Sequence, residues 1–169
     1  MSVLPPTPLH RVWRLPADVD TDALAPGATM KFGLDVTARH CLESLRPEFA
    51  AEVRRGDVIA AAGNFGIGSS REQAAAVLVR LGVAAVIAPS FSGLYLRNGF
   101  NLGLLLLTCP QAENLRDGER VGLDARSGRV VREDGTALAC ETIPEFLLDM
   151  VQAGGLLEQL RHRNRKEKA

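Results

Sequence analysis

The sequence lacks an excess of charge of either sign. Twenty Lys and Arg residues balance twenty Asp and Glu residues in a chain of 169, so the net charge gives no indication of a nucleic-acid partner. Basic residues do gather at the C-terminus, in RHRNRKEKA at residues 161–169. We expect this run to be a solvated, frayed tail rather than a nucleic-acid patch.

A hydrophobic run long enough to cross a membrane is also missing. The stretch LGLLLLTC at residues 102–109 is far shorter than the roughly 18 residues of a membrane span and is typical of a buried strand. The N-terminal segment MSVLPPTPLHRV lacks the charged start and apolar core of a signal peptide. We therefore expect a cytoplasmic protein with no membrane partner.

Cysteine is scarce, and its spacing excludes several kinds of site. Cys41, Cys109 and Cys140 are odd in number and far apart, with no CxxC pair. By themselves they form neither a disulfide framework nor a metal or cluster site. This usage agrees with a reducing compartment, and we expect no metal ligand in this chain. Any metal would have to come from another chain.

The length and composition fit one ordinary globular domain. With 46% hydrophobic and 24% charged residues, the chain can bury one sizeable core. We see no internal repeat or low-complexity linker and predict a single domain over residues 1–169. At its start, the pattern predicts a strand at 9–15, a loop at 16–27 and a helix at 36–45.

The middle of the chain predicts a βαβ unit. Short apolar runs at 57–62 and 84–88 flank a helical pattern at 69–81, which requires parallel pairing and a right-handed crossover. We further predict a buried strand at 104–108, a hairpin at 121–131, a turn at 133–136 and a helix at 143–153 that is interrupted at Gly154-Gly155. A parallel core followed by antiparallel strands indicates an α/β fold with layered sheets.

The most informative stretch is GNFGIGSSREQ at residues 63–73, and it does not fit a nucleotide-binding loop. A dinucleotide fingerprint needs a third glycine where Arg71 stands, and a phosphate-binding loop needs a lysine that is missing here. Two interpretations stay open. Ser69 and Glu72 match a capping box, which would stabilise a helix by about 1 kcal/mol.

The second interpretation is an anion site. The stretch follows a predicted parallel strand, where open α/β sheets bind ligands. Its glycines allow close backbone approach, the helix N-terminus favours an anion, and Arg71 offers a planar fork for a carboxylate. These residue types favour an acidic small molecule as the ligand.

Four motifs carry a resemblance to a known family. They are DVDTDALAPG (18–27), GNFGIGSSREQA (63–74), VIAPSF (86–91) and NGFNLGLLLL (98–107). Together they resemble the small subunits of 3-isopropylmalate dehydratases and the swivel domain of aconitases. The resemblance implies a layered β/β/α swivel domain with a parallel-sheet core. It covers roughly residues 18–107, and we expect it to extend to the remainder of the chain.

The resemblance also implies a chemistry, that of a hydro-lyase of leucine biosynthesis. In this family a large subunit carries a [4Fe–4S] cluster, and the small subunit completes the active site in a heterodimer or heterotetramer. The substrate is a di- or tricarboxylic acid such as 3-isopropylmalate. On the matching positions, Ser69 is the catalytic base, Ser70 and Arg71 hold a substrate carboxylate, and Asp22 supports them.

Two departures from the family pattern concern the substrate. Gln73 stands where relatives usually have His, and Gln cannot transfer a proton. The segment ATMKFG at 28–33 differs from the aliphatic loop expected of a leucine-pathway enzyme. Lys31 in this segment is either a contact to a second carboxylate or an ordinary exposed lysine.

Other readings therefore stay open. The substrate could be another substituted malate or a homoaconitate-type acid, and the chain could be a non-catalytic module that binds carboxylates or a partner. Asn64 either shapes a turn or contacts substrate. We expect Ser90 and Asn98 to support the loop.

Overall fold

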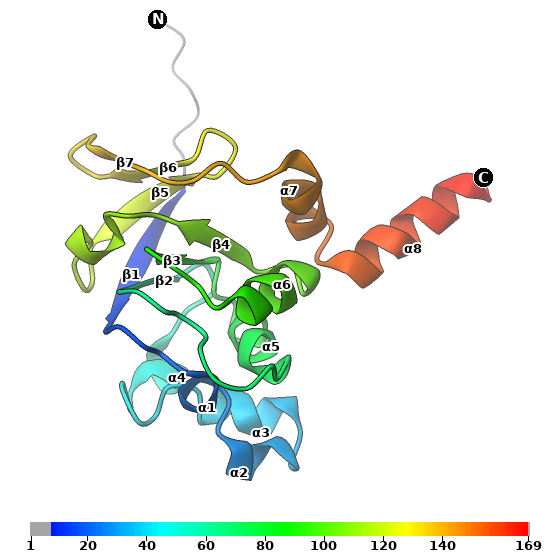
Figure 1. Ribbon diagram of the computed structural model, residues 1–169, viewed down its shortest axis with the longest axis horizontal. Coiled ribbons are helices and arrows are strands. Elements are labelled where there is room, and N and C mark those ends of the chain that lie inside the picture. The colour runs from blue at the N-terminus through cyan, green and yellow to red at the C-terminus, as the bar shows by residue number, and fades with distance from the viewer. Residues whose placement is uncertain (1–7, 169) are drawn as a thin grey trace, which may run out of the picture.

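The computed structural model describes residues 8–168 and contains one seven-stranded mixed sheet of order β4-β3-β2-β1-β5-β6-β7 (Figure 1). Of the N-terminal segment that lacks the features of a signal peptide, residues 1–7 lie outside the described residues. Ala169 also lies outside them. The strands are β1 (Leu9–Leu15), β2 (Val58–Ala61), β3 (Ala85–Ala88), β4 (Leu105–Thr108), β5 (Arg120–Asp124), β6 (Arg129–Arg132) and β7 (Ala137–Ala139).

Strands β1 to β4 form a parallel half-sheet. Val12 lies opposite Val58, Val58 opposite Ala85, and Ala85 opposite Leu105. This half-sheet confirms the βαβ unit and the third buried strand. Because all four strands run the same way, their carboxyl ends meet at one edge, where ligands bind in open α/β sheets.

The antiparallel half of the sheet is built from β1, β5, β6 and β7. Strand β5 pairs with β1 and with β6, and β6 pairs with β7. The β5–β6 hairpin turns at Ser127-Gly128, and the next turn, at residues 133–136, leads into β7. Both turns were predicted. In the structure Gly128 and Gly135 adopt the positive φ that glycine allows.

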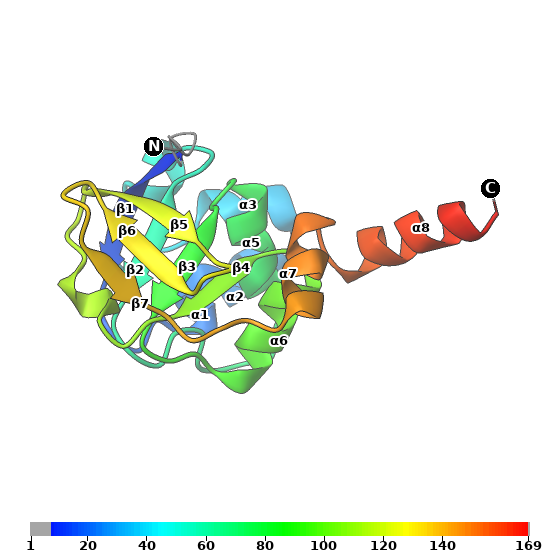
Figure 2. The same cartoon turned by 90° about the horizontal axis from the view of Figure 1, so that it is seen from above.

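Three layers result, because β5–β7 fold over one face of the parallel half-sheet and helices cover the other (Figures 1 and 2). Successive residues of a strand point to opposite faces. In β2, Ile59 and Ala61 belong to the core shared with the helices, whereas Val58 and Ala60 belong to the core shared with β5–β7. The predicted β/β/α layering is confirmed.

Some of the predicted helices are confirmed, and others are shorter than predicted. They are α1 (Thr21–Leu24), α2 (Gly27–Met30), α3 (Leu34–Arg39), α4 (Phe49–Glu52), α5 (Gln73–Arg80), α6 (Gly93–Asn101), η1 (Ala112–Asn114), α7 (Glu145–Gln152) and α8 (Leu156–Glu167). Among residues 8–168, no helix combines the length and apolar character needed to cross a membrane.

Two predictions for the N-terminal region were wrong in part. The expected loop at 16–27 contains α1 and the start of α2; Asp20 accepts a hydrogen bond from Ala23 N at 2.7 Å and caps α1. The expected helix at 36–45 ends at Arg39. Leu42 adopts φ +60° and donates its N–H to Ala23 O at 2.8 Å, so a contact with α1 replaces further helix.

The C-terminal region also differs from its prediction. Helix α7 and the interruption at Gly154-Gly155 are confirmed, but residues 161–167 continue helix α8 instead of fraying. Leu, Gln, Glu, Arg and Lys dominate helix α8 and are strong helix formers. Residues 161–168 are exposed, as a solvated segment would be, and the helix points away from the sheets (Figure 2).

Candidate active-site loop

The loop at residues 63–71 leaves the carboxyl end of β2 and is held on both sides. Gly66 N donates to Val19 O at 2.7 Å, in the segment after β1. On the other side, Phe65 N donates to Ser90 O at 3.1 Å, in the segment after β3. The loop therefore forms the central part of the edge where the parallel strands end.

Gly66 allows the loop to pass close to α6. It adopts φ +82°, and a Cβ at this position would lie 2.2 Å from Cγ of Tyr95. Tyr95 is buried, and its hydroxyl donates to Ala74 O at 3.1 Å. Any residue other than glycine would displace the ring or the loop.

The predicted capping box is wrong. Helix α5 begins at Gln73 with Glu72 as its N-cap residue, and no side chain makes a capping hydrogen bond there. Ser69 lies four residues before the helix, in irregular backbone. The chain stays irregular because distant groups bind it, at Ser70 and at Arg71. The hydroxyl of Ser69 is exposed and available for another role.

Arg71 is the centre of the hydrogen-bond network in this loop. Its Nη1 donates to Asp22 Oδ1 at 3.1 Å and to Ala25 O at 2.9 Å, and its Nη2 donates to Ser69 Oγ at 3.3 Å. A guanidinium has five N–H donors. Two of them remain without an acceptor in the described part of the chain, and they suit a carboxylate.

Asp22 fixes the position of Arg71 and stays ionised. Its Oδ1 accepts from Gly27 N at 3.0 Å as well as from Arg71. The hydrogen bond from Gly27 N, and secondly the one from Arg71, lower the pKa of the Asp22 carboxyl. The structure thus brings together Asp22, Ser69 and Arg71, with the exposed Ser70 between the last two. The backbone groups of Ala25 and Gly27 were missed by the sequence analysis, because no side-chain pattern marks them.

Asn64 shapes the turn, as one of its two interpretations required. It adopts φ +60°, its N–H donates to Ser90 Oγ at 2.8 Å, and its Nδ2 donates to Asp18 Oδ1 at 2.9 Å. Asp18 also has a positive φ, of 58°. Ser90 is confirmed as a support of the loop.

Lys31 lies apart from this network. It is exposed at the end of α2, with its ammonium 5.0 Å from the ring centroid of Phe32. Within residues 8–168 it makes no hydrogen bond or ion pair with the other predicted site residues. Lys31 is thus exposed and lies outside this network, and its contact with a second carboxylate stays a prediction.

The two residues that follow Arg71 in the chain, Glu72 and Gln73, help to line a groove of about 280 Å³. It is lined by Met30, Gly33, Leu34, Thr37, Glu72, Gln73 and Ala76. The groove brings Gln73 together with the segment at 28–33, two features that the sequence analysis linked to substrate choice. It is partly apolar, through Met30, Leu34 and Ala76.

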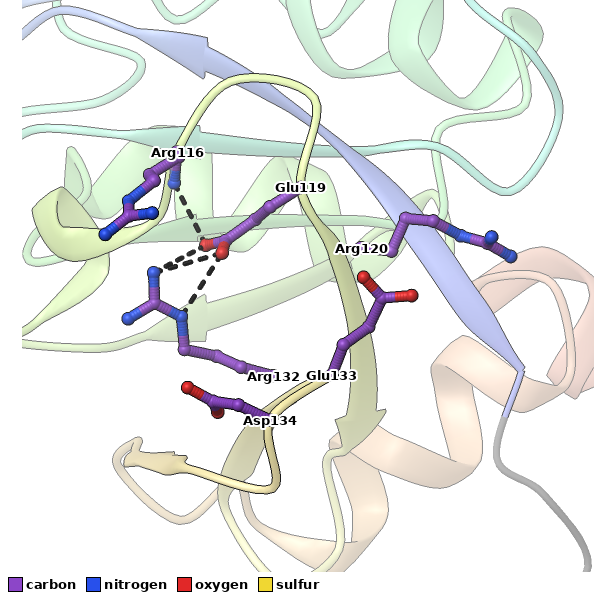
Figure 3. Close-up of a pocket in the computed structure, with 6 residues that line it drawn as sticks. All are labelled: Arg116, Glu119, Arg120, Arg132, Glu133 and Asp134. Carbon is purple, nitrogen blue, oxygen red and sulfur yellow. Dashed lines mark hydrogen bonds and ion pairs between the residues drawn. The ribbon is translucent and has the colours of Figure 1, made fainter.

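A second cavity, of about 220 Å³, lies on the antiparallel half-sheet and is lined by Arg116, Glu119, Arg120, Arg132, Glu133 and Asp134 (Figure 3). Here Arg132 makes a two-pronged ion pair with Glu119, with Nε–Oε2 and Nη2–Oε1 distances of 3.2 Å. No lining residue belongs to the loop at 63–71. Because three acidic side chains balance the three arginines here, this cavity offers less to an anionic substrate than Arg71 does.

The comparisons with known proteins agree with this geometry. Residues 47–112 match the family model of the aconitase C-terminal domain. A homoaconitase small subunit of Methanothermobacter thermautotrophicus is 42% identical over 149 residues, which are 87% of this chain and 86% of that protein. A 3-isopropylmalate dehydratase small subunit of Archaeoglobus fulgidus is 37% identical over 152 residues, 89% of this chain and 94% of that protein.

A solved structure extends the likeness to the whole fold. The crystal structure of a 3-isopropylmalate dehydratase from Methanocaldococcus jannaschii matches with a TM-score of 0.86 and 34% sequence identity. The match covers 95% of this chain and 98% of that one. The chain therefore belongs to the family of 3-isopropylmalate dehydratase small subunits, hydro-lyase components that contain the aconitase C-terminal domain.

Proposed function

We propose that this chain completes the active site of a heteromeric hydro-lyase that moves or removes the hydroxyl of a 2-hydroxy diacid such as 3-isopropylmalate. The observation that carries the proposal is the contact between Ser69 Oγ and the Arg71 guanidinium at 3.3 Å, at the carboxyl edge of the parallel strands. That contact places a hydroxyl beside a fixed positive charge, in a loop that is open to a ligand.

Ser69 is the proposed catalytic base. A serine hydroxyl is a weak base, and it needs groups that stabilise its oxygen when it is negatively charged. The Nη2–H of Arg71 points at this oxygen and supplies that stabilisation without reorganisation, because Asp22 and Ala25 already hold the guanidinium. As the stabilised alkoxide, Ser69 would take a proton from the substrate carbon next to a carboxylate and become a hydroxyl again.

Ser70 and Arg71 are the proposed carboxylate-binding residues. The two remaining N–H donors of Arg71 and the exposed hydroxyl of Ser70 can share one substrate carboxylate. The ion pair with Asp22 leaves the guanidinium charged and fixes its plane. Asp22 therefore acts through Arg71 and need not contact substrate itself.

The proposed cofactor is a [4Fe–4S] cluster on the partner large subunit, which would bind the substrate hydroxyl as a Lewis acid. Residues 8–168 of this chain bring together no group of three His, Cys, Asp or Glu side chains suited to a metal ion. The name "small subunit" of the relatives agrees with a large-subunit partner. The cytoplasmic location remains part of the proposal.

The groove lined by Gln73 and by residues of the segment at 28–33 bears on the choice of substrate. Met30, Leu34 and Ala76 line it, and apolar walls suit a branched aliphatic group such as the isopropyl group of 3-isopropylmalate. A homoaconitate-type acid is the second candidate, because the relative that is 42% identical is a homoaconitase small subunit. Lys31, in the segment beside the groove, would then contact the additional carboxylate.

A reconstitution tests the proposal. The chain is co-expressed anaerobically with a cluster-bearing large subunit of the same family, and alkene formation is followed with 3-isopropylmalate, 2,3-dimethylmalate, homocitrate and citrate. We expect turnover of one of these acids, and only when both subunits are present. If homocitrate is the substrate, Lys31→Ala should raise its KM. A tight complex that turns over none of the four would favour the non-catalytic binding module.

A further inference from the structure

One face of helix α6 holds the loop on both sides of Ser69. Tyr95 and Asn98 lie one turn apart, so that they share a face. Tyr95 contacts the loop before Ser69, at Gly66, and Asn98 contacts it after Ser69, where Nδ2 donates to Ser70 O at 3.1 Å. The two contacts enclose the proposed base.

Helix α6 is itself firmly seated, and this makes it a suitable template. A Cβ at Gly99 would lie 2.6 Å from Leu106, so the helix packs directly on strand β4. Tyr95 is fully enclosed between the loop and α5, with its ring 5.3 Å from that of Phe65 and its hydroxyl bonded to Ala74 O. Helix α6 can therefore hold the loop in a fixed position.

The segment from Ser69 to Arg71 needs such a support, because it lies in no helix or strand. Its carbonyl at Ser70 has a side-chain donor, Asn98, as its partner. Fixing this carbonyl fixes the peptide plane between Ser70 and Arg71. The directions of the neighbouring side chains then follow from that plane.

We propose that Asn98 is a positioning residue for Ser69 and Ser70, acting through the Ser70 carbonyl. The proposal rests on the proposed function of Ser69 and extends it to a residue of another element. Asn98 contacts no substrate in this account. It keeps the hydroxyls of the loop at the distance that proton transfer requires, and a misplacement of about 1 Å can cost roughly 100-fold in rate.

The test uses the reconstituted complex with Asn98→Ala, Asn98→Asp and the control Asn101→Ala. Asn101 lies one turn further along α6, and its side chain makes no hydrogen bond within the described residues. We expect Asn98→Ala to lower kcat by about 10- to 100-fold, with KM and the melting temperature nearly unchanged. Asn98→Asp should be no better, because a carboxylate cannot donate to a carbonyl. Wild-type kcat in Asn98→Ala would overturn the proposal.

A second measurement needs no activity. In the free chain, limited digestion with trypsin reports opening of the loop through cleavage after Arg71, since cleavage follows the population of the open form. We expect this cleavage to be several-fold faster in Asn98→Ala than in the wild type or in Asn101→Ala. Equal rates would refute the positioning role. If the wild-type complex lacks turnover while the cleavage rates differ as expected, the proposed function fails and the structural role of Asn98 stands.

Discussion

Among the glycines of the active-site loop, Gly66 is the one at which an added Cβ would make the shortest contact. In Gly66→Ala, the backbone would keep a φ of +82° and the new Cβ would lie 2.2 Å from Cγ and 2.5 Å from Cβ of Tyr95. The left-handed conformation costs an L-residue about 1–2 kcal/mol. Displacing a packed side chain adds about 1–3 kcal/mol. We therefore expect Gly66→Ala to lower the free energy of unfolding by about 2–5 kcal/mol.

Gly118→Ala is the matched control, because Gly118 adopts φ +80° and a Cβ there would meet nothing within 4 Å. This variant should lose only the backbone contribution, about 1–2 kcal/mol. Urea unfolding of both variants gives the two free energies directly. In thermal melts, each kcal/mol corresponds to about 2–4 °C for a chain of this size. An equal loss in the two variants would show that Tyr95 does not press on the loop, and would refute the reasoning.

Two further predictions concern titratable groups. Burial raises the pKa of the Asp57 carboxyl, but hydrogen bonds from Arg11, Arg54 N and Trp13 outweigh it and leave that pKa below its usual value. A carboxyl whose pKa is lower in the folded than in the unfolded state stabilises the protein at pH values above the unfolded-state pKa. At pH 7 the wild type should therefore be more stable than Asp57→Asn by about 2 kcal/mol, and urea unfolding should show this difference shrinking below about pH 4. A difference that does not change with pH would contradict this. The neighbouring Cys140 thiol lowers the pKa of the Cys109 thiol. Cys140→Ala should raise that pKa, measured by thiolate absorbance at 240 nm, and an unchanged midpoint would exclude the contact.

Much of the sheet could be predicted because its strands carry strong local patterns. The strand at Leu9–Leu15 was predicted with the bounds that the structure gives. The short apolar runs around β2 and β3 defined the βαβ unit, and glycines at positive φ marked the hairpin turns. These features depend on neighbouring residues, which a sequence displays directly.

The errors occur where contacts between distant segments decide the backbone. The four-residue helices α1 and α2 are too short to show a periodic pattern. Ser69 looks like a helix cap because Glu72 follows at the right spacing, yet Asn98 holds Ser70 and Ala25 holds Arg71 in an irregular path. No local pattern reports a partner that is 28 or 46 residues away.

The candidate site was predicted in part for a related reason. The motif residues Ser69, Ser70 and Arg71 are adjacent in the chain, and the family resemblance added Asp22, which the structure places 3.1 Å from Arg71. Lys31 was an open alternative, and the structure leaves it exposed beside Phe32. The motifs marked the adjacent candidate residues and suggested Asn98 as a support of the loop, whereas the atom that Asn98 binds, the Ser70 carbonyl, became evident only from the contacts.

The central claim is that Ser69 is the catalytic base of a hydro-lyase. Its most direct test compares Ser69→Ala with Ser44→Ala in the reconstituted complex, since Ser44 is also exposed but lies outside the loop. Loss of a general base should lower kcat by about 100- to 10,000-fold, while subunit affinity and substrate binding persist and Ser44→Ala remains fully active. A Ser69→Ala complex that retains wild-type kcat would contradict the account.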